Sequence, residues 1–296
     1  MRKCYKRWHI AIILLAFSSF AAAQNFDTVN IKVTKVSGSV YMLEGSGGNI
    51  GALVGNDGII LVDDQFAPLS EKIKKALATL SDKPIKFIIN THFHFDHTDG
   101  NKALGGEGAI IVAHENTRKR LTTDQFIATF KVDQKAMTYD GLPKITFSES
   151  VSFNMNEETV QVFHVKNAHT DGDAIIYFRA SNVVHTGDVF VRYGLPFIDQ
   201  PNGGNVDGMI TAVDQILKMI NDDTKIIPGH GALSNKKDLQ DYKNMVQTVR
   251  NRVADGIKNG KTMNQIVDSD PAKEFTTIFD KILFVESVYN SLKKQN

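Results

Sequence analysis

One stretch of the sequence reads Thr91-His92-Phe93-His94-Phe95-Asp96-His97. It places three histidines and one aspartate directly after the apolar run Ile85–Asn90, which predicts a buried strand. Side chains two positions apart in an extended segment point the same way, so His92 and His94 can face one ion. Asp96 begins a turn into a helix, and the adjacent His97 then faces away from His92. The four side chains therefore divide between two metal centres.

Each centre needs further ligands from other parts of the chain. The candidates are His169 in Ala168-His169-Thr170, Asp188 in Thr186-Gly187-Asp188, and His230 in Pro228-Gly229-His230-Gly231. All three lie where a predicted strand meets a loop, the usual place for chemistry on a rigid sheet. Imidazole and carboxylate groups suit Zn²⁺, and a catalytic zinc keeps one coordination position for water.

Apolar runs between glycines and turn residues predict strands in both halves of the chain. In the first half they are Ile31–Val36, Val40–Leu43, Ile50–Val54, Ile59–Val62, Ile85–Asn90 and Ala109–Ala113. In the second half they are Val151–Phe153, Val160–Val165, Ala174–Phe178, Val183–His185 and Lys225–Ile227. This arrangement predicts two sheets that face each other.

Helical periodicity predicts the covering layers. The expected helices are Pro68–Leu80, Asp99–Leu104, a mixed but helical segment between Glu115 and Asp140, Asp207–Ile220 with Asp207 as a cap, and the segment from Lys236 onward. The sequence has no exact internal repeat and no low-complexity linker, which indicates one mature domain with the helices outside the two sheets.

The first 23 residues differ in composition from the rest. They begin with four basic residues, continue with the apolar run Ile10–Phe20 and end with Ala21-Ala22-Ala23. This order predicts a secretory signal peptide over residues 1–23. The apolar run is shorter than the about 20 residues that are needed to span a bilayer, which disfavours a membrane-spanning helix. An uncleaved membrane anchor is the alternative. We expect the domain at 24–296 to be periplasmic or secreted.

Cleavage would remove Cys4, the one cysteine, leaving no disulfide and no thiolate ligand. It would also remove 4 of the 34 basic residues, leaving 30 against 33 acidic ones and a net charge of −3. A net charge of −3 does not indicate the basic surface that nucleic-acid binders have. We expect a small-molecule substrate, no nucleic-acid partner and no membrane association after cleavage. The sequence leaves the oligomeric state open.

Taken in order, these motifs resemble those of the metallo-β-lactamase superfamily of metallohydrolases. The resemblance runs from about Val40 to Gly231. It implies an α/β fold, a four-layer αββα sandwich, with the C-terminal helices as part of the same domain. An aspartate at Asp188 is more typical of glyoxalase II, lactonases and other dinuclear hydrolases than of true β-lactamases.

The resemblance also implies a role for each candidate side chain. His92, His94 and His169 match the first metal site, and Asp96, His97 and His230 match the second. Asp188 matches the carboxylate that bridges two Zn²⁺ ions. Asp63, or its neighbour Asp64, matches an aspartate that orients a ligand histidine.

Together these features predict an exported dinuclear zinc hydrolase that cleaves a small ester, lactone or β-lactam-type amide. A water bound to zinc has a pKa near 7, so a metal-bound hydroxide could attack the carbonyl near neutral pH. Asp96 is the predicted catalytic residue, which orients the nucleophile and carries its proton. One alternative is a mononuclear iron oxidoreductase of the persulfide dioxygenase type. Another is a binding protein with a degenerate site.

Several other residues have weaker interpretations. His114, His164 and His185 match no motif and are expected to be structural. Arg192 could bind a substrate carboxylate or lie in solvent, and Gly203-Gly204-Asn205 could border the pocket or turn the chain. The aromatic residues between Phe126 and Phe130 are expected in a helix core first and in a lid second.

Overall fold

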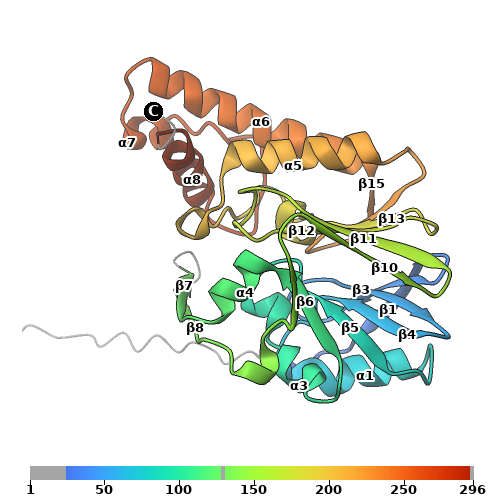
Figure 1. Ribbon diagram of the computed structural model, residues 1–296. Helices are drawn as coiled ribbons and strands as arrows, with labels where there is room; N and C mark the ends of the chain where they lie inside the picture. Colours follow the sequence, from blue (N-terminus) through green and yellow to red (C-terminus); the bar gives the residue numbers. More distant parts are fainter. Residues whose placement is uncertain (1–24, 128–130, 294–296) are drawn as a thin grey trace, which may run out of the picture.

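The computed structural model describes residues 25–127 and 131–293. Two β-sheets pack face to face, and helices cover the outer face of each sheet (Figure 1). The predicted four-layer αββα sandwich is confirmed. The predicted signal peptide at 1–23 lies outside the described residues.

The first sheet has seven strands in the order β1-β2-β3-β4-β5-β6-β9. Its strands are β1 (Lys32–Ser37), β2 (Val40–Glu44), β3 (Ile50–Gly55), β4 (Gly58–Val62), β5 (Ile85–Ile89), β6 (Ile110–His114) and β9 (Ile145–Phe147). Strands β1 to β4 pair antiparallel, whereas β4, β5, β6 and β9 pair parallel. The carboxyl ends of β4 and β5 therefore meet at one edge of the sheet.

The second sheet has six strands in the order β10-β11-β12-β13-β14-β15. Its strands are β10 (Ser150–Met155), β11 (Glu158–His164), β12 (Ala174–Phe178), β13 (Val183–His185), β14 (Lys225–Ile227) and β15 (Ser234–Asn235). Here β13 and β14 form the parallel pair. A separate hairpin of β7 (Gln125–Ile127) and β8 (Val132–Gln134) lies outside both sheets.

Helices α1 and α3 cover the first sheet, and α5 and α6 cover the second (Figure 1). The α-helices are α1 (Ser70–Ala78), α2 (Phe95–Thr98), α3 (Asn101–Gly105), α4 (Glu115–Leu121), α5 (Val206–Met219), α6 (Lys236–Lys258), α7 (Met263–Asp268) and α8 (Lys281–Lys293). The short 3-10 helices are Phe26–Thr28, Ala67–Leu69, Tyr139–Gly141, Gly187–Val189 and Gln200–Asn202. Among the described residues, no helix is long and apolar enough to cross a membrane.

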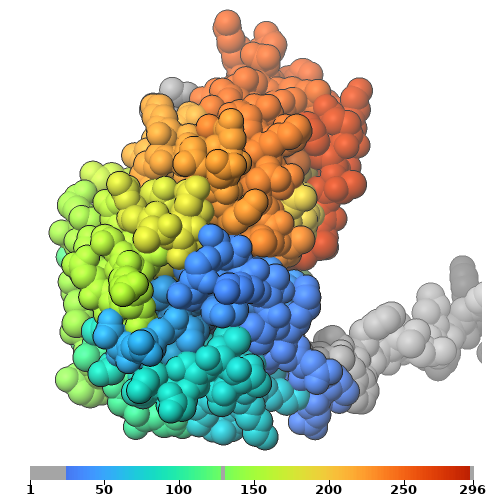
Figure 2. Space-filling view, turned by 90° about the vertical axis from the view of Figure 1, so that its right-hand side faces the viewer, coloured from blue at the N-terminus to red at the C-terminus, as the bar shows by residue number. Residues whose placement is uncertain are grey.

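Three apolar clusters hold the layers together. One lies between the sheets and includes Val62, Ile89 and Val162. A second joins the first sheet to α1 through residues such as Ile73. The third, the largest, joins the second sheet to α5, α6 and α8. In Figure 2 the N-terminal half, in blue and cyan, stacks below the orange C-terminal helices.

Two predictions about helices were wrong. Among the described residues between Glu115 and Asp140, the α-helix is α4; β7 and β8 then pair as antiparallel strands, and the segment ends in the 3-10 helix Tyr139–Gly141. At the start of α5 the cap is Asn205, not Asp207, because the Asn205 side chain accepts hydrogen bonds from the backbone N–H groups of Asp207 and Gly208. Gly203-Gly204-Asn205 thus turns the chain into α5, and Asp207 lies in its first turn.

Candidate metal centre

Three histidines converge where the chain leaves β5 and β11. His94 Nδ1 lies 3.1 Å from His92 Nε2 and 2.9 Å from His169 Nε2. The three side chains, which we call the first triad, are each at most 3% exposed. His92 and His94 follow the parallel strand β5, and His169 comes from the loop between β11 and β12. The expectation that His92 and His94 face one point agrees with this geometry.

Hydrogen bonds fix the orientation of these rings. The other nitrogen of each ring faces an acceptor: His92 Nδ1 lies 2.9 Å from Thr91 Oγ1, His94 Nε2 lies 2.9 Å from Asp199 Oδ2, and His169 Nδ1 lies 2.9 Å from the Phe197 carbonyl oxygen. Each ring therefore carries its proton on the outer nitrogen. The inner nitrogens direct three lone pairs at one point, and a cation there would satisfy all of them.

A second group, the second triad, lies beside the first. His97 Nε2 is 3.3 Å from His230 Nε2 and 3.7 Å from Asp96 Oδ2, and His230 Nε2 is 3.2 Å from the same oxygen. Asp96 and His97 lie in the short helix α2, and His230 follows β14. These three side chains also have the spacing of a metal site.

Asp188 lies between the two triads. Its Oδ1 is 3.3 Å from His97 Nε2, and its Oδ2 is 3.7 Å from His169 Nε2 and 3.5 Å from His230 Nε2. Oδ1 is buried yet accepts no hydrogen bond. A buried carboxylate oxygen without a hydrogen bond is costly, so this atom favours a cation.

Two glycines make room for side chains of this centre. A Cβ atom at Gly48 would lie 2.1 Å from the His97 ring, and one at Gly229 would lie 2.0 Å from Asp188 Oδ1. Any larger residue would displace these side chains. The Asn49 side chain next to Gly48 donates hydrogen bonds to the carbonyls of Pro228 and Gly231, which fixes the His230 loop against β3. The residues present therefore fit a pair of divalent cations.

Asp63 orients histidines of both triads. Its Oδ2 accepts a hydrogen bond from His97 Nδ1 at 2.7 Å and another from Thr91 Oγ1 at 2.8 Å, and Thr91 in turn orients His92. Asp63 follows β4 with a φ of +63°, a conformation that non-glycine residues rarely adopt. Of the two predicted choices, Asp64 instead lies buried against Gly100, and its carboxylate oxygens have no hydrogen bond. Burial raises the Asp64 pKa well above 3.8.

Sequence reasoning missed Asp199. Its carboxylate accepts hydrogen bonds from His94 Nε2 and from the side-chain amide of Asn202 at 2.8 Å. Asp199 precedes the 3-10 helix Gln200–Asn202 and lies in no recognisable motif. The one available signal was an aspartate that caps a short Pro-Asn turn.

The charge state differs between the triads. Burial lowers the pKa of His169 to about 4 and that of His92 well below 6.5, so both rings are neutral at pH 7. Burial alone would lower the pKa of His230 as well. The charge of Asp188 and hydrogen bonds to Asp188 and Asp96 outweigh burial and raise the pKa of His230 to about 9. A histidine ligates a metal only when neutral, so a cation in the second triad would replace this proton.

The second triad is the open side of the centre. The side chains of Asp96 and His230 are 21% and 23% exposed. The Tyr193 ring packs beside His230, with ring centroids 5.8 Å apart. Arg192 pairs with Asp238 at 3.0 Å, so it is neither bound to a carboxylate in the pocket nor fully solvated.

The remaining histidines have structural contacts. His185 Nδ1 accepts from the backbone N–H of Gly187, and its Nε2 lies 3.0 Å from the Asn49 carbonyl. His114 caps α4 and stacks on His164, with ring centroids 3.7 Å apart. Phe126 lies in β7 and is 55% exposed, so the prediction of a helix core there was wrong. Residues 128–130 lie outside the described range.

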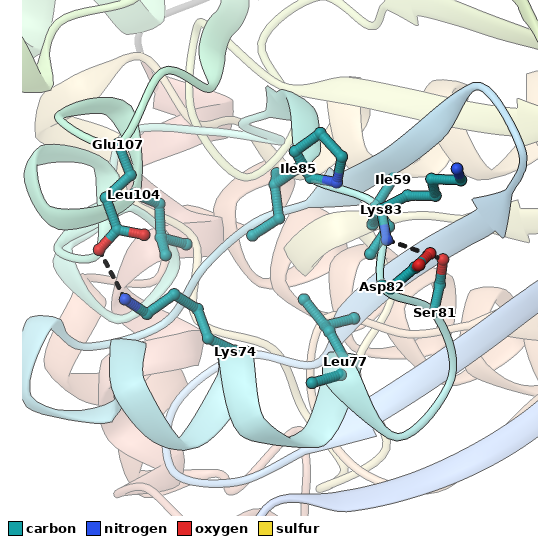
Figure 3. Close-up of a pocket in the computed structure, with 11 residues that line it drawn as sticks. Ile59, Lys74, Leu77, Ser81, Asp82, Lys83, Ile85, Leu104 and Glu107 are labelled. Atoms are coloured by element: carbon teal, nitrogen blue, oxygen red, sulfur yellow. Dashed lines mark hydrogen bonds and ion pairs between the residues drawn. The ribbon is translucent and has the colours of Figure 1, made fainter.

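A separate cavity of about 240 Å³ lies far from this centre. Its floor includes Ile59 and Ile85, at the starts of β4 and β5, whereas the ligands follow the end of β5. Figure 3 shows Lys74 reaching across this cavity to Glu107, with which it forms an ion pair. Lys74 also pairs with Glu71, so its charge is already neutralised.

Comparison with known proteins gives the wider context. A family model described as the metallo-beta-lactamase superfamily matches residues 43–230. A hydroxyacylglutathione hydrolase of Pelagibacter ubique (strain HTCC1062) is 29% identical over 162 residues, which are 53% of this chain and 57% of that protein. The chain thus spans little more than half the length of this relative.

Two solved structures resemble most of this fold. The sec-alkyl sulfatase PisA1, in a double-mutant form, has a TM-score of 0.70 at 15% identity, covering 88% of this chain and 50% of that one. DIM-1 metallo-beta-lactamase has a TM-score of 0.61 at 16% identity, covering 74% of this chain and 99% of that one. These likenesses are likenesses of fold.

Proposed function

The chain belongs to the metallo-beta-lactamase superfamily, and from this we propose that it is an exported dinuclear zinc hydrolase of a small ester, lactone or β-lactam-type amide. One observation carries the proposal: seven donor side chains from both halves of the chain converge on two adjacent triads that share Asp188. The basic start, apolar run and Ala21-Ala22-Ala23 of the sequence support export.

In this proposal each triad holds one ion. His92, His94 and His169 would bind the first, Asp96, His97 and His230 the second, and Asp188 would bind both. Bound zinc would lower the pKa of water and polarise the carbonyl group under attack. The chain's own residues then have to position that water, move its proton and admit the substrate.

We assign the proton transfer to Asp96. Its Oδ2 faces His230 and His97, and its carboxylate lies on the exposed side of the centre. The charges of His97 and His230 and a hydrogen bond to His230 outweigh burial and lower the pKa of Asp96, so the group is ionised at neutral pH and can accept a proton. The buried first triad offers no comparable group at the opening.

Related proteins define the range of substrates to test. One relative is named a hydroxyacylglutathione hydrolase, and a short segment is 42% identical over 55 residues to a linear primary-alkylsulfatase of Pseudomonas sp. (strain ATCC 19151). The decisive experiment is a hydrolysis screen of the zinc-loaded protein with esters, lactones, cephalosporins, carbapenems, thioesters, sulfate esters and phosphodiesters. Hydrolysis of a carbonyl substrate supports the proposal, and cleavage of sulfate esters or phosphodiesters alone rejects it.

The second candidate is a mononuclear iron oxidoreductase of the persulfide dioxygenase type. It would use only part of the ligand set, whereas both triads and Asp188 are complete here. Metal analysis separates the two functions. Two zinc ions per chain support hydrolysis, and one iron with substrate-dependent oxygen uptake supports the alternative.

Export has a separate test. Expression of the full chain with a C-terminal tag in a Gram-negative host, followed by mass spectrometry, should give a mature protein that begins after Ala23. An intact N-terminus in the cytoplasm would reject export and leave the hydrolase proposal standing.

A further inference from the structure

A line of hydrogen bonds leads from His94 to a charged side chain outside the metal centre. Asp199 Oδ2 accepts from His94 Nε2 at 2.9 Å and from Asn202 Nδ2 at 2.8 Å. The Oδ1 atom of the same Asn202 amide accepts a hydrogen bond from Arg120 Nη1 at 2.5 Å. Arg120 lies in α4, 82 residues before Asn202. Two side chains thus connect its guanidinium group to a histidine of the first triad.

The direction of the Arg120 guanidinium group is fixed by Asp171. Arg120 Nε and Nη2 donate to the two carboxylate oxygens of Asp171 at 2.7 Å and 2.6 Å. The remaining nitrogen, Nη1, faces Asn202 and also lies 3.5 Å from Gln125 Oε1. A guanidinium group is planar, so two hydrogen bonds to one carboxylate set the direction of the third nitrogen. The Arg120 side chain is 20% exposed, which limits competition from water.

The Asn202 amide is held at both of its ends. Its acceptor faces Arg120 and its donor faces Asp199, and the residue is 7% exposed. Removing the guanidinium group would take away the donor that Oδ1 has here. Because an unpaired buried acceptor is costly, the amide would then gain by turning toward water and away from Asp199. Arg120 therefore helps to keep the Asp199 carboxylate in place.

A ring contact gives Arg120 a second connection to His94. Its guanidinium carbon lies 5.5 Å from the centroid of the Phe93 ring, a cation–π distance. Phe93 is fully buried, and its ring centroid lies 4.5 Å from that of His94. The Arg120 side chain therefore approaches the same histidine by a polar route and by an apolar one.

Other residues of α4 fasten the loop that carries His169. Asn116 Nδ2 donates to the Asp171 carbonyl at 2.8 Å, and Thr117 Oγ1 donates to the Gly172 carbonyl at 2.9 Å. These contacts hold the backbone to which the Asp171 carboxylate is attached. The partner of Arg120 is thus itself anchored, and α4 is joined to the surroundings of two of the three histidines of the first triad.

We propose that Arg120 is a positioning residue for His94. It acts through Asn202 and Asp199, which hold the His94 ring so that Nδ1 faces the other histidines of the first triad. The inference rests on the proposed function, because it assigns Arg120 a part in holding the cation of that triad. It goes beyond that function by placing a determinant of metal affinity in α4, two side chains away from a ligand.

The first test measures zinc affinity by competition with a chromophoric chelator. The affinity that is lost in His94→Ala identifies the first triad. Arg120→Met keeps the aliphatic stem but removes the donors, and it should weaken that affinity about tenfold, the lower end of the range for residues that orient a ligand. The affinity of the second triad should stay unchanged. Arg120→Lys keeps the charge without the planar fork and should recover only part of the loss.

Arg118→Met is the matched control. Arg118 lies in the same helix, and its Nη1 donates to the Pro143 carbonyl at 2.7 Å. The control therefore also loses a hydrogen bond between α4 and a neighbouring segment, but on a side that does not lead to Asp199. It should keep both zinc affinities, even where it lowers Tm as much as Arg120→Met does.

A double-mutant cycle tests the route from Arg120 to the metal centre. If Arg120 acts through Asp199, Arg120→Met should add little to the loss of affinity in Asp199→Asn, because the two changes interrupt one line of contacts. Losses that add fully would show that Arg120 affects the triad by another route and would overturn the proposal.

A measurement on the metal-free protein separates this role from the proposed function. Long-range ¹H–¹⁵N NMR reports which nitrogen of the His94 ring carries the proton. The wild type should carry it on Nε2, facing Asp199, and Arg120→Met should raise the fraction that carries it on Nδ1, whereas Arg118→Met should not. If the wild type binds no zinc, the proposed function fails and this spectrum alone decides the role of Arg120. A His94 signal unchanged in Arg120→Met would overturn the proposal and leave Arg120 as a link between α4 and the loop of Asp171.

Discussion

The two triads use the same kinds of ligand but differ in burial and charge. The first consists of three histidines that are almost completely buried, with acceptors fixing their outer nitrogens. The second contains a carboxylate, and its Asp96 and His230 are partly exposed. The first is therefore suited to hold an ion firmly, and the second to meet the substrate. Variants of each triad, and of Asp188 between them, test whether the two triads have these different roles.

The largest loss of metal binding and activity is expected for a variant of Asp188, which lies between the two triads. Asp188→Asn removes the charge shared by both, so we expect both ions to bind more weakly and kcat/KM to fall on the order of 10³-fold. Metal content by mass spectrometry and steady-state hydrolysis measure this. Asp222→Asn, at an exposed ion pair with Lys236, is the control and should change neither. Wild-type metal content in Asp188→Asn would remove the bridge from the mechanism.

The next effect belongs to the open triad alone. Asp96→Asn should lower kcat about 10²- to 10⁴-fold, because it removes the proton acceptor, and should leave the fold intact. Circular dichroism and zinc stoichiometry report on the fold and on the first triad. Full activity in this variant would contradict the role of Asp96.

Variants of Asp199 and Asp63, the aspartates that orient the histidines, should weaken ion binding at the two triads differently and with smaller effects. Asp199→Asn should weaken one ion about 10- to 100-fold, because Asp199 orients His94 only. Asp63→Asn should weaken both ions, since its carboxylate reaches His97 directly and His92 through Thr91. Competition titrations with a chromophoric chelator measure both affinities. Loss of a single ion in Asp63→Asn would show that the triads are oriented independently.

Chelation should change stability moderately. At a metal concentration of about 100 times Kd, each bound ion stabilises the folded state by about 2.7 kcal/mol, so two ions contribute about 5.4 kcal/mol. Removing both ions should therefore lower Tm by roughly 9 °C in a chain of this size. Scanning calorimetry with and without chelator measures the shift, and the second triad should lose its ion first. An unchanged Tm would indicate that the native protein holds no metal.

The smallest effect is a pH dependence of the metal-free protein. The folded-state pKa of His230 is raised to about 9 from 6.5, so the folded state binds the proton more tightly than the unfolded state. The resulting stability is fully present below pH 6.5 and is lost as the pH rises through about 9. Urea unfolding between pH 6 and 9.5 measures this slope. His230→Gln should flatten it, whereas a slope unchanged in that variant would assign the effect to other groups.

Much of this architecture was predictable from the sequence because its signals are local. Apolar runs between glycines marked most strands, and the run from His92 to His97 marked the ligands that one strand end carries. Asp63 was predictable only through the resemblance to a known family. The structure brings all seven predicted ligands together.

The missed features depend on distant contacts. Asp199 reaches His94 across 105 residues, and Asn49 reaches the loop of His230 across 179. No local pattern encodes such pairs. The β7–β8 strands have three residues each, too short for a periodicity to be read, and were mistaken for helix. At the start of α5 the sequence contains the capping residue Asn205, but the prediction assigned the cap to Asp207, two residues later.

The ligands are also spread along the chain in a fixed order. His92 to His97 leave the ribosome first, and His230 follows 133 residues after His97. Until that last loop has been made and packed against Asn49, the second triad lacks a member. The three histidines of the first triad are all present by residue 169, whereas the second triad depends on the loop 228–231, so an ion at the second triad would be bound later than one at the first.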